Sequence, residues 1–254
     1  MQPLPTQPLS GQRVVICRAA ADAAPLRQQL VRLGAEVLSV PLVEPIPPTD
    51  NGRSLDASVA ELDRYDWLVT TSANGSRAVL NAMERVRVAA TPKLACVGAV
   101  TASVFTEAGL VVSLQASVSS AAGLVAQFPE ASTPERVLAP LARLASGQLE
   151  DGLRAKGYDV DRRDAYDTAP ATVTDRQRTD ISDASSILFT SSSTVDRFVD
   201  IVGLDLVPTV AVSIGPKTSS TMTRRGVAIA IEADVHNQEG VIEALCQVVS
   251  TMDR

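Results

Sequence analysis

Four short segments rich in Ser and Thr have the composition of turns at which a strand ends and a helix begins. They are TTSANGS at 70–76, VGAVT at 97–101, TSSST at 190–194 and SIGPKTSS at 213–220. The first amide groups of a helix lack partners within the helix and carry a partial positive charge. Such turns therefore bind anions, and the chemistry indicated is the binding of carboxylates or phosphates.

Ser and Thr are also ordinary helix N-caps, and a cap stabilises a helix by about 1 kcal/mol without any ligand. For a single turn, capping alone is the simpler interpretation. Four turns at related places favour a ligand cleft, because the carboxyl ends of parallel strands meet along one edge of a sheet. The pattern does not identify the ligand.

Three further side chains are candidates for contact with a ligand. Arg18 ends the first predicted strand and would point toward the crevice, although a surface arginine is an equally good interpretation. Lys217 lies in the last of the four turns, where it would either meet an anion or be exposed. Tyr166 ends a polar extended segment at the mouth of the predicted cleft, and packing is the default interpretation of such a tyrosine.

Composition and motifs exclude several functional classes. The 254 residues are 45% hydrophobic and 3% aromatic with a net charge of -6, so the chain can bury a core but lacks the basic charge and stacking surface of nucleic-acid-binding proteins. Cys17, Cys96 and Cys246 form no CxxC pair and His236 is the only histidine, which argues against the usual zinc sites. P-loop, dinucleotide and nucleophile-elbow motifs are not present.

The sequence also bears on where the protein works. The N-terminal segment has no basic stretch followed by an apolar one, and the uncharged run at 108–129 is interrupted by Ser, Gln and Gly. We therefore expect neither a signal peptide nor a membrane span, and a cytoplasmic protein. The few aromatic residues and the lack of an evident exposed apolar stripe favour a monomer, and we expect neither nucleic acid nor a membrane as partner.

The turns are connected by alternating strands and helices. Helical periodicity fits the segments between the strands, with Asp22 as a candidate N-cap of the first helix and Gly34 closing it. Strands rich in Val, Ile and Leu that alternate with helices predict parallel sheets covered on both faces. The predicted strands lie at 14–18, 35–40, 66–71, 93–98, 110–114, 136–141, 186–191, 209–215 and 227–231.

An internal repeat predicts two similar lobes. The segment 70–79 resembles 189–198 with an offset of 119 residues, and residues 14–34 resemble 137–157 with an offset of 123. Between them, Gly98, Thr101 and Gly109 match Gly215, Thr218 and Gly226 at an offset of 117. The repeated features keep their order along most of the chain, as in duplicated folds.

Two extended segments, Pro-rich 41–48 and polar 158–170, follow the first strand–helix–strand unit of each repeat. We expect the chain to cross between the lobes at both, so that lobe 1 comprises 1–40 plus 171–254, lobe 2 comprises 49–160, and 41–48 and 161–170 are linkers. The predicted fold is α/β, with two similar three-layer, flavodoxin-like lobes that contain parallel sheets. A two-stranded extended linker would join them.

These segments together resemble the uroporphyrinogen-III synthase family over roughly residues 11–250. The resemblance rests on VVICR with the helix ending at Gly34, and on DWLVTTSANGSRAV, KLACVGAVTASVFTEAG, DAYDT, SSILFTSSSTVDRF and AVSIGPKTSSTMTRRG. It implies two α/β lobes, one built from both chain ends and one from the middle. It also implies an activity that needs no metal and no organic cofactor.

The implied activity is that of a lyase of haem biosynthesis. Such enzymes close the linear tetrapyrrole hydroxymethylbilane to uroporphyrinogen III, with loss of water and inversion of the last pyrrole ring. The substrate would lose its hydroxyl to give a reactive azafulvene, and a spiro intermediate would follow. Positioning and exclusion of the competing closure would do most of this work. Lobes joined by a hinge flanked by Pro47 and Pro170 could close over the substrate.

The resemblance also implies roles for the candidate residues. Tyr166 matches the family tyrosine proposed to help the hydroxyl leave, and because phenols are weak acids we expect assistance rather than an indispensable acid. Arg18 and five residues on cleft-facing turns would bind substrate carboxylates, largely through backbone N–H groups: Thr71, Ser72, Thr101, Ser191 and Thr218. Two alternatives remain open, a non-catalytic ligand-sensing or regulatory module of this fold and a generic sugar- or phosphate-binding protein.

Overall fold

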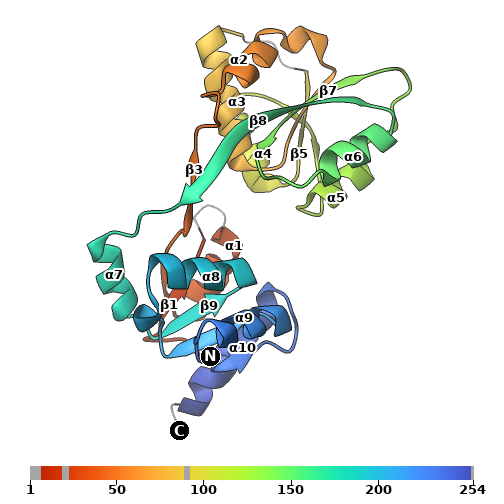
Figure 1. Ribbon diagram of the computed structural model, residues 1–254. Helices are drawn as coiled ribbons and strands as arrows, with labels where there is room; N and C mark the ends of the chain where they lie inside the picture. Colours follow the sequence, from red (N-terminus) through yellow and green to blue (C-terminus); the bar gives the residue numbers. More distant parts are fainter. Residues whose placement is uncertain (1–6, 19–22, 89–91, 253–254) are drawn as a thin grey trace. The chain divides into compact units, whose positions relative to one another are not determined.

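The computed structural model describes residues 7–18, 23–88 and 92–252, which form two compact units. Unit 1 comprises Met1–Glu44 and Pro170–Arg254, and unit 2 comprises Pro45–Ala169. The chain leaves unit 1 through β3 (Val43–Ile46) and returns through β8 (Asp159–Pro170), and these strands are neighbours in one sheet (Figure 1). Asp22, the candidate N-cap, lies outside the described residues.

Unit 2 is a six-stranded sheet between two layers of helices, with the strand order β3-β8-β7-β4-β5-β6. The strands β8, β7, β4, β5 and β6 pair in parallel. Helices α2, α3 and α4 bury Leu55, Val79 and Phe105 on one face, and α5 and α6 bury Leu124 and Leu149 on the other (Figure 1). The elements are α2 (Arg53–Ala60), a 3-10 turn (Leu62–Arg64), β4 (Trp67–Thr70), α3 (Ala73–Val86), β5 (Lys93–Cys96), α4 (Ala99–Glu107), β6 (Val112–Gln115), α5 (Ala121–Gln127), β7 (Arg136–Ala142) and α6 (Gln148–Ala155).

Unit 1 has the same layers around a parallel sheet of order β11-β10-β9-β1-β2. Leu30 of α1 and Leu245 of α10 are buried on one face, and Ile181 of α7, Phe198 of α8 and Met222 of α9 on the other. The elements are β1 (Arg13–Ile16), α1 (Ala24–Arg32), β2 (Glu36–Ser39), α7 (Asp175–Ser182), β9 (Ser186–Phe189), α8 (Ser192–Ile201), a 3-10 turn (Leu204–Leu206), β10 (Val210–Ser213), α9 (Pro216–Arg224), β11 (Ile231–Glu232) and α10 (Gln238–Met252).

The two sheets have equivalent strand orders. When the repeat offsets are applied, β2-β1-β9-β10-β11 of unit 1 corresponds to β8-β7-β4-β5-β6 of unit 2. This is the 2-1-3-4-5 order of flavodoxin-like folds, in which ligands bind where the order reverses, beside the first and third strands. The predicted three-layer, flavodoxin-like fold is confirmed, and the reversal lies between β7 and β4 in unit 2 and between β1 and β9 in unit 1.

The structure differs from two expectations. Residues 161–170 are extended and their strand neighbours β3, as expected of a two-stranded linker, but β8 also belongs to the sheet of unit 2, since it pairs with β7 from Asp159 to Tyr166. Its charged side chains conceal the strand: Asp161 pairs with Arg163 of the same strand, and Arg162 pairs with Glu150 of α6. The strand predicted at 227–231 is wrong, since β11 contains only Ile231–Glu232; instead the Val227 N–H bonds the Met222 C=O and closes α9.

Candidate functional site

The carboxyl edge of the sheet in unit 2 brings Ser72 and Tyr166 together. Ser72 is the N-cap of α3 and has extended backbone angles, and its Oγ accepts a hydrogen bond of 3.1 Å from the Gly75 N–H. The same Oγ lies 3.1 Å from the Tyr166 Oη, although the two residues are 94 positions apart in the sequence. Tyr166 is half-buried, and its ring packs against the core beneath α3. The start of α3 therefore holds Ser72 in place, and the core holds Tyr166.

A register shift in β7 explains how Tyr166 reaches Ser72. Strands β7 and β8 pair one to one until Leu141 opposite Asp164, and then Ala142 lies opposite Tyr166. Side chains alternate between the faces of a regular strand, so Arg162, which contacts α6, and Tyr166 would point to the same face. The shift re-aims Tyr166 toward α3, as β-bulges do. No sequence signal marks this irregularity.

Thr71 and Thr101 lie at the same edge but in different surroundings. Thr71 is half-buried in the turn between β4 and α3. Thr101 is 5% exposed in the first turn of α4, and its C=O accepts a hydrogen bond of 3.3 Å from the Ser76 Oγ of α3. Its burial favours packing between α3 and α4 over contact of its hydroxyl with a ligand.

The other predicted residues belong to unit 1. Ser191 is the N-cap of α8, and its Oγ accepts from the Thr194 N–H at 3.3 Å. Thr218 is buried in the first turn of α9, where its N–H bonds the Gly215 C=O at 2.9 Å. Arg18 is exposed after β1. These residues lie at the carboxyl edge of their own sheet, and the expectation that both edges face one cleft stays a prediction.

Ser119, from a loop, lies over the start of α4, and His236 lies in the equivalent place over the start of α9. A Cβ placed on Gly98 would be 2.5 Å from the Ser119 Oγ, and one placed on Gly215 would be 2.9 Å from the His236 Cδ2. A larger residue at either glycine would thus have to displace the side chain that lies over it. His236 is exposed, as expected, and also contacts α9. The offset of 117 that relates Gly98 to Gly215 also relates Ser119 to His236, and this signal was available in the sequence.

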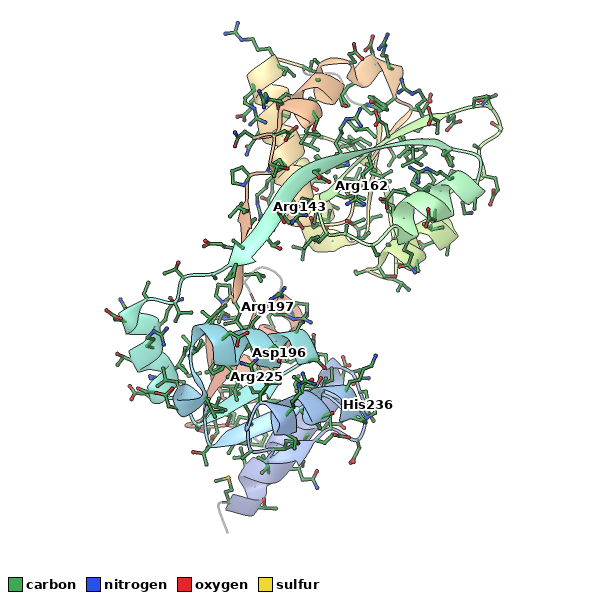
Figure 2. All side chains as sticks on the ribbon, viewed as in Figure 1. Arg143, Arg162, Asp196, Arg197, Arg225 and His236 are labelled. Carbon is green, nitrogen blue, oxygen red and sulfur yellow. The ribbon has the colours of Figure 1, made fainter. Side chains whose placement is uncertain are left out.

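Sequence reasoning missed the loop between β7 and α6. The Arg143 N–H donates to the Tyr166 C=O at 2.9 Å, so the loop begins beside the Ser72–Tyr166 pair. Arg162 of β8 donates to the Ala142 C=O at 3.0 Å and the Arg143 C=O at 2.8 Å (Figure 2). Arg162 also donates to Glu150 Oε1 at 2.8 Å, and Glu150 is only 3% exposed. A largely buried ion pair therefore holds the loop in place.

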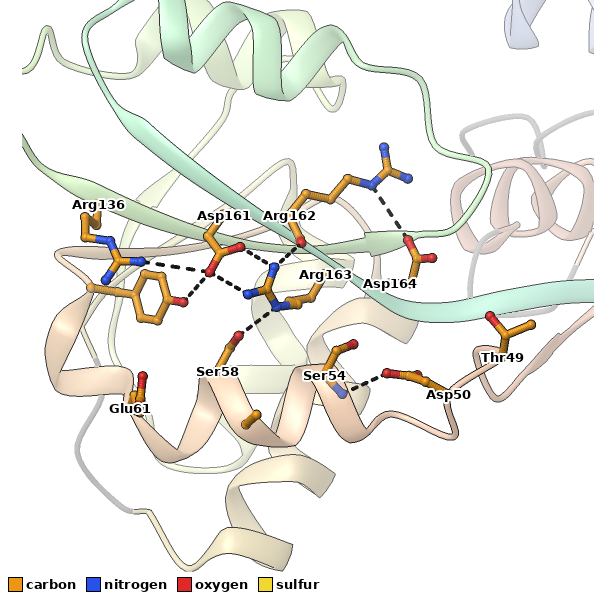
Figure 3. Close-up of a pocket in the computed structure, with 12 residues that line it drawn as sticks. Thr49, Asp50, Ser54, Ser58, Glu61, Arg136, Asp161, Arg162, Arg163 and Asp164 are labelled. Carbon is orange, nitrogen blue, oxygen red and sulfur yellow. Dashed lines mark hydrogen bonds and ion pairs between the residues drawn. The ribbon is translucent and has the colours of Figure 1, made fainter.

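A polar cavity of about 770 Å³ between α2 and β8 is a second candidate for a functional site (Figure 3). Arg163 pairs with Asp161 and donates to the Ser58 Oγ at 2.8 Å, and Asp161 accepts from the Tyr65 hydroxyl at 2.6 Å. Burial, followed by the bond to Asp161, raises the pKa of Tyr65. These groups satisfy one another, and neither member of the Ser72–Tyr166 pair lines the cavity. We interpret its polar walls as a structural network.

Two other kinds of feature are absent from the parts of the chain that the structure describes. No helix there has the length and apolar character needed to cross a membrane. No group of three or more His, Cys, Asp or Glu side chains there is arranged to hold a metal ion.

Comparison with known proteins gives a consistent result. The family described as uroporphyrinogen-III synthase HemD matches residues 24–243. The uroporphyrinogen-III synthase of Synechococcus elongatus is 31% identical over 95% of this chain and 97% of its own length. The porphyrin biosynthesis protein HemD of Ruminiclostridium josui is 26% identical over 95% of this chain and 49% of its own length.

Solved structures resemble the fold. A mutant uroporphyrinogen III synthase from the extremely thermophilic bacterium Thermus thermophilus has a TM-score of 0.52 at 17% identity, covering 95% of this chain and 100% of that one. The uroporphyrinogen-III synthetase of Helicobacter pylori also has a TM-score of 0.52, at 16% identity, covering 93% of this chain and 99% of that one. At these identities the likeness concerns the fold alone.

Proposed function

The chain belongs to the uroporphyrinogen-III synthase family, and we propose that the Ser72–Tyr166 edge of unit 2 acts on the leaving hydroxyl of hydroxymethylbilane. The family relationship supports an enzyme of porphyrin biosynthesis over the ligand-sensing alternative. The single observation that carries the assignment of the site is the 3.1 Å contact between the two hydroxyl groups at the carboxyl edge of the sheet.

The Ser72 hydroxyl has one proton to donate and two lone pairs, one of which accepts from the Gly75 N–H. In the arrangement that would serve the reaction, the Ser72 proton is donated to the Tyr166 Oη. The phenol proton of Tyr166 is then free to be donated to the hydroxyl oxygen of the substrate. Tyr166 would assist the departure of that hydroxyl as water, and Ser72 would be a positioning residue.

Ring closure would follow from how the substrate is held. The C–O bond breaks and water leaves, the last ring attacks through its substituted carbon, and the spiro intermediate opens and recloses with loss of a ring proton. The reaction neither oxidises nor reduces the substrate, and its class is that of a lyase. Thr71, Ser191 and Arg18, with the first amides of α3 and α8, would bind carboxylates and select this closure, whereas Thr218, which is 3% exposed, would support α9 from within. Thr101 would support α3 and α4 from within.

The remaining parts of the proposal concern the state of the protein. We expect it to act as a cytoplasmic monomer on a small molecule, with no metal or organic cofactor. The net charge of -6 does not oppose an acidic ligand, because helix starts and a few cations act locally.

The isomer ratio of the product tests the function directly. Hydroxymethylbilane is supplied to the purified protein, the products are oxidised, and types III and I are separated and quantified. We expect mainly type III, because spontaneous closure gives type I. A product that is all type I, at a protein concentration where a known synthase gives type III, would sink the proposal.

A further inference from the structure

Arg143 uses its guanidinium differently from the arginines beside it. Its Nε pairs with Asp167 Oδ2 at 2.5 Å, and its terminal nitrogens make no hydrogen bond or ion pair within the described residues. Arg162 and Arg163, in contrast, each use both terminal nitrogens for protein oxygens. Two terminal nitrogens of one guanidinium form a fork that matches the two oxygens of a carboxylate.

The position of Arg143 is where this fold binds ligands. Arg143 follows β7 and Ser72 follows β4, and these neighbouring strands lead into α6 and α3 on opposite faces of the sheet. Such a reversal of strand order opens a crevice at the carboxyl edge. The backbone bond between the Arg143 N–H and the Tyr166 C=O places the backbone of the arginine next to that of Tyr166, whose hydroxyl meets Ser72. In unit 1, Arg18 and Ser191 follow the two equivalent strands, β1 and β9.

The surroundings hold Arg143 ready for a ligand. Arg162 fixes the carbonyl groups of Ala142 and Arg143, and Asp167 fixes the Arg143 Nε. The bond from Arg143, followed by that from the Thr168 N–H, lowers the pKa of Asp167, which keeps this carboxylate ionised at neutral pH. The Arg143 side chain is 42% exposed, so its fork remains open to solvent. A preorganised fork loses little conformational freedom on binding.

We propose that Arg143 binds a carboxylate of the substrate through both terminal nitrogens, beside the Ser72–Tyr166 pair. This inference rests on the proposed function and adds a residue to it. The carboxylate would belong to the pyrrole whose hydroxyl leaves or to the ring next to it, because Arg143 and Tyr166 are joined through their backbones. The two contacts would orient the ring that reacts.

Kinetics of Arg143→Gln and Arg143→Lys test the inference. Loss of a charge-assisted bidentate contact is expected to raise KM for hydroxymethylbilane about tenfold or more in Arg143→Gln, with kcat changed by less than about threefold. Arg143→Lys keeps the charge but not the fork, so its KM should lie between those of the other two proteins. Binding of uroporphyrin III, measured by fluorescence, should weaken in the same order.

Arg64→Gln is the matched control. Arg64 is an exposed arginine that pairs through one nitrogen with Glu61, and it lies before β4, at the opposite edge of the sheet. Its substitution removes the same charge and should leave KM unchanged. A KM for Arg143→Gln equal to that of the unsubstituted protein would overturn the inference.

Asp167→Asn distinguishes substrate binding by the terminal nitrogens of Arg143 from a role of the Arg143–Asp167 ion pair. Asn can still accept from the Arg143 Nε, so KM should change by less than about threefold if substrate binding uses the terminal nitrogens. A rise in KM as large as in Arg143→Gln would mean that the pair itself matters, and would overturn the inference. If Arg143→Gln fails to fold, the KM values of Arg143→Lys and Asp167→Asn decide. A KM that is raised in Arg143→Lys but nearly unchanged in Asp167→Asn supports the inference, and an unchanged KM in Arg143→Lys overturns it. Failure of the unsubstituted protein to form type III would count against the proposed function instead.

Discussion

Tyr166 and Ser72 derive their role from one another rather than from unusual chemistry of either residue. The serine is a cap that would stabilise α3 in any protein, and the tyrosine packs on a core. Their 3.1 Å contact joins the hydroxyl group of a cap and that of a packing residue in one hydrogen-bonded chain. Neither residue alone carries this information, which is why the sequence predicted the catalytic role of Tyr166 only through resemblance to a family.

Tyr166→Phe tests the role of the phenol. We expect kcat to fall about 10- to 100-fold, since assistance by a positioned proton donor is lost. The free energy of unfolding should change by less than about 1.5 kcal/mol, because one partly buried hydrogen bond is removed. Steady-state assays and urea unfolding measure the two quantities. Tyr65→Phe, which removes a hydroxyl from the cavity wall, should leave kcat unchanged. Unchanged turnover in Tyr166→Phe would remove the residue from the mechanism.

At the scale of elements, a buried ion pair connects β8, the loop after β7 and α6. Glu150 lies in the first turn of α6, with one carboxylate oxygen bonded to Arg162 and the other without a partner among the residues that the structure describes. Arg162 also caps loop carbonyl groups at the end of β7. Breaking a buried pair on one side leaves a charge that the surroundings do not compensate.

Arg162→Met should therefore destabilise the protein strongly. The free energy of unfolding is expected to fall by about 3 kcal/mol, because the Glu150 carboxylate would remain buried and unpaired. Adding Glu150→Leu should recover much of this loss, since the charge is then removed too. Arg64→Met, which breaks an exposed pair, should change stability by less than about 1 kcal/mol. Urea unfolding of the four proteins provides the comparison, and an Arg162→Met value near that of Arg64→Met would contradict the expectation.

The elements that sequence reasoning predicted well are those with strong local signals. The central strands β1, β4, β5, β7, β9 and β10 are apolar on both faces because helices cover both. Strand β8 was not predicted as part of the sheet because its alternation is hidden by Asp161, Arg162 and Arg163, of which Arg162 pairs with Glu150 of α6 and the other two pair with each other. Arg143 was missed for a similar reason, since its place beside Tyr166 depends on a strand register that no local pattern encodes.

At the scale of the whole molecule, unit 2 has the features of an independent folding unit. It is continuous in sequence, has a complete helix–sheet–helix arrangement, and begins and ends in the adjacent strands β3 and β8. Domains with their own core and neighbouring ends are tolerated as separate proteins. The hinge flanked by Pro47 and Pro170 concerns the placement of the two units and stays a prediction.

A fragment of residues 45–169 is expected to fold alone. It should unfold cooperatively in urea and show slow amide exchange in β4, β5 and β7, because both of its cores are complete. The shorter fragment 49–160, bounded as the sequence alone suggested, lacks β3 and most of β8 and should be far less stable. Equal stability of the two fragments would show that β8 contributes little to the unit.

The order of the strands along the chain has a consequence for the history of the molecule. Residues 13–39 supply the first two strands of unit 1, 67–115 the last three of unit 2, 136–170 the first two of unit 2, and 186–232 the last three of unit 1. Each half of the polypeptide thus contains a complete set of five strands but shares it between both sheets. Segment exchange between two identical subunits, followed by fusion of their genes, would produce this arrangement. A half-length ancestor with this exchange would be an intertwined homodimer, and joining its subunits end to end would make the exchange independent of protein concentration.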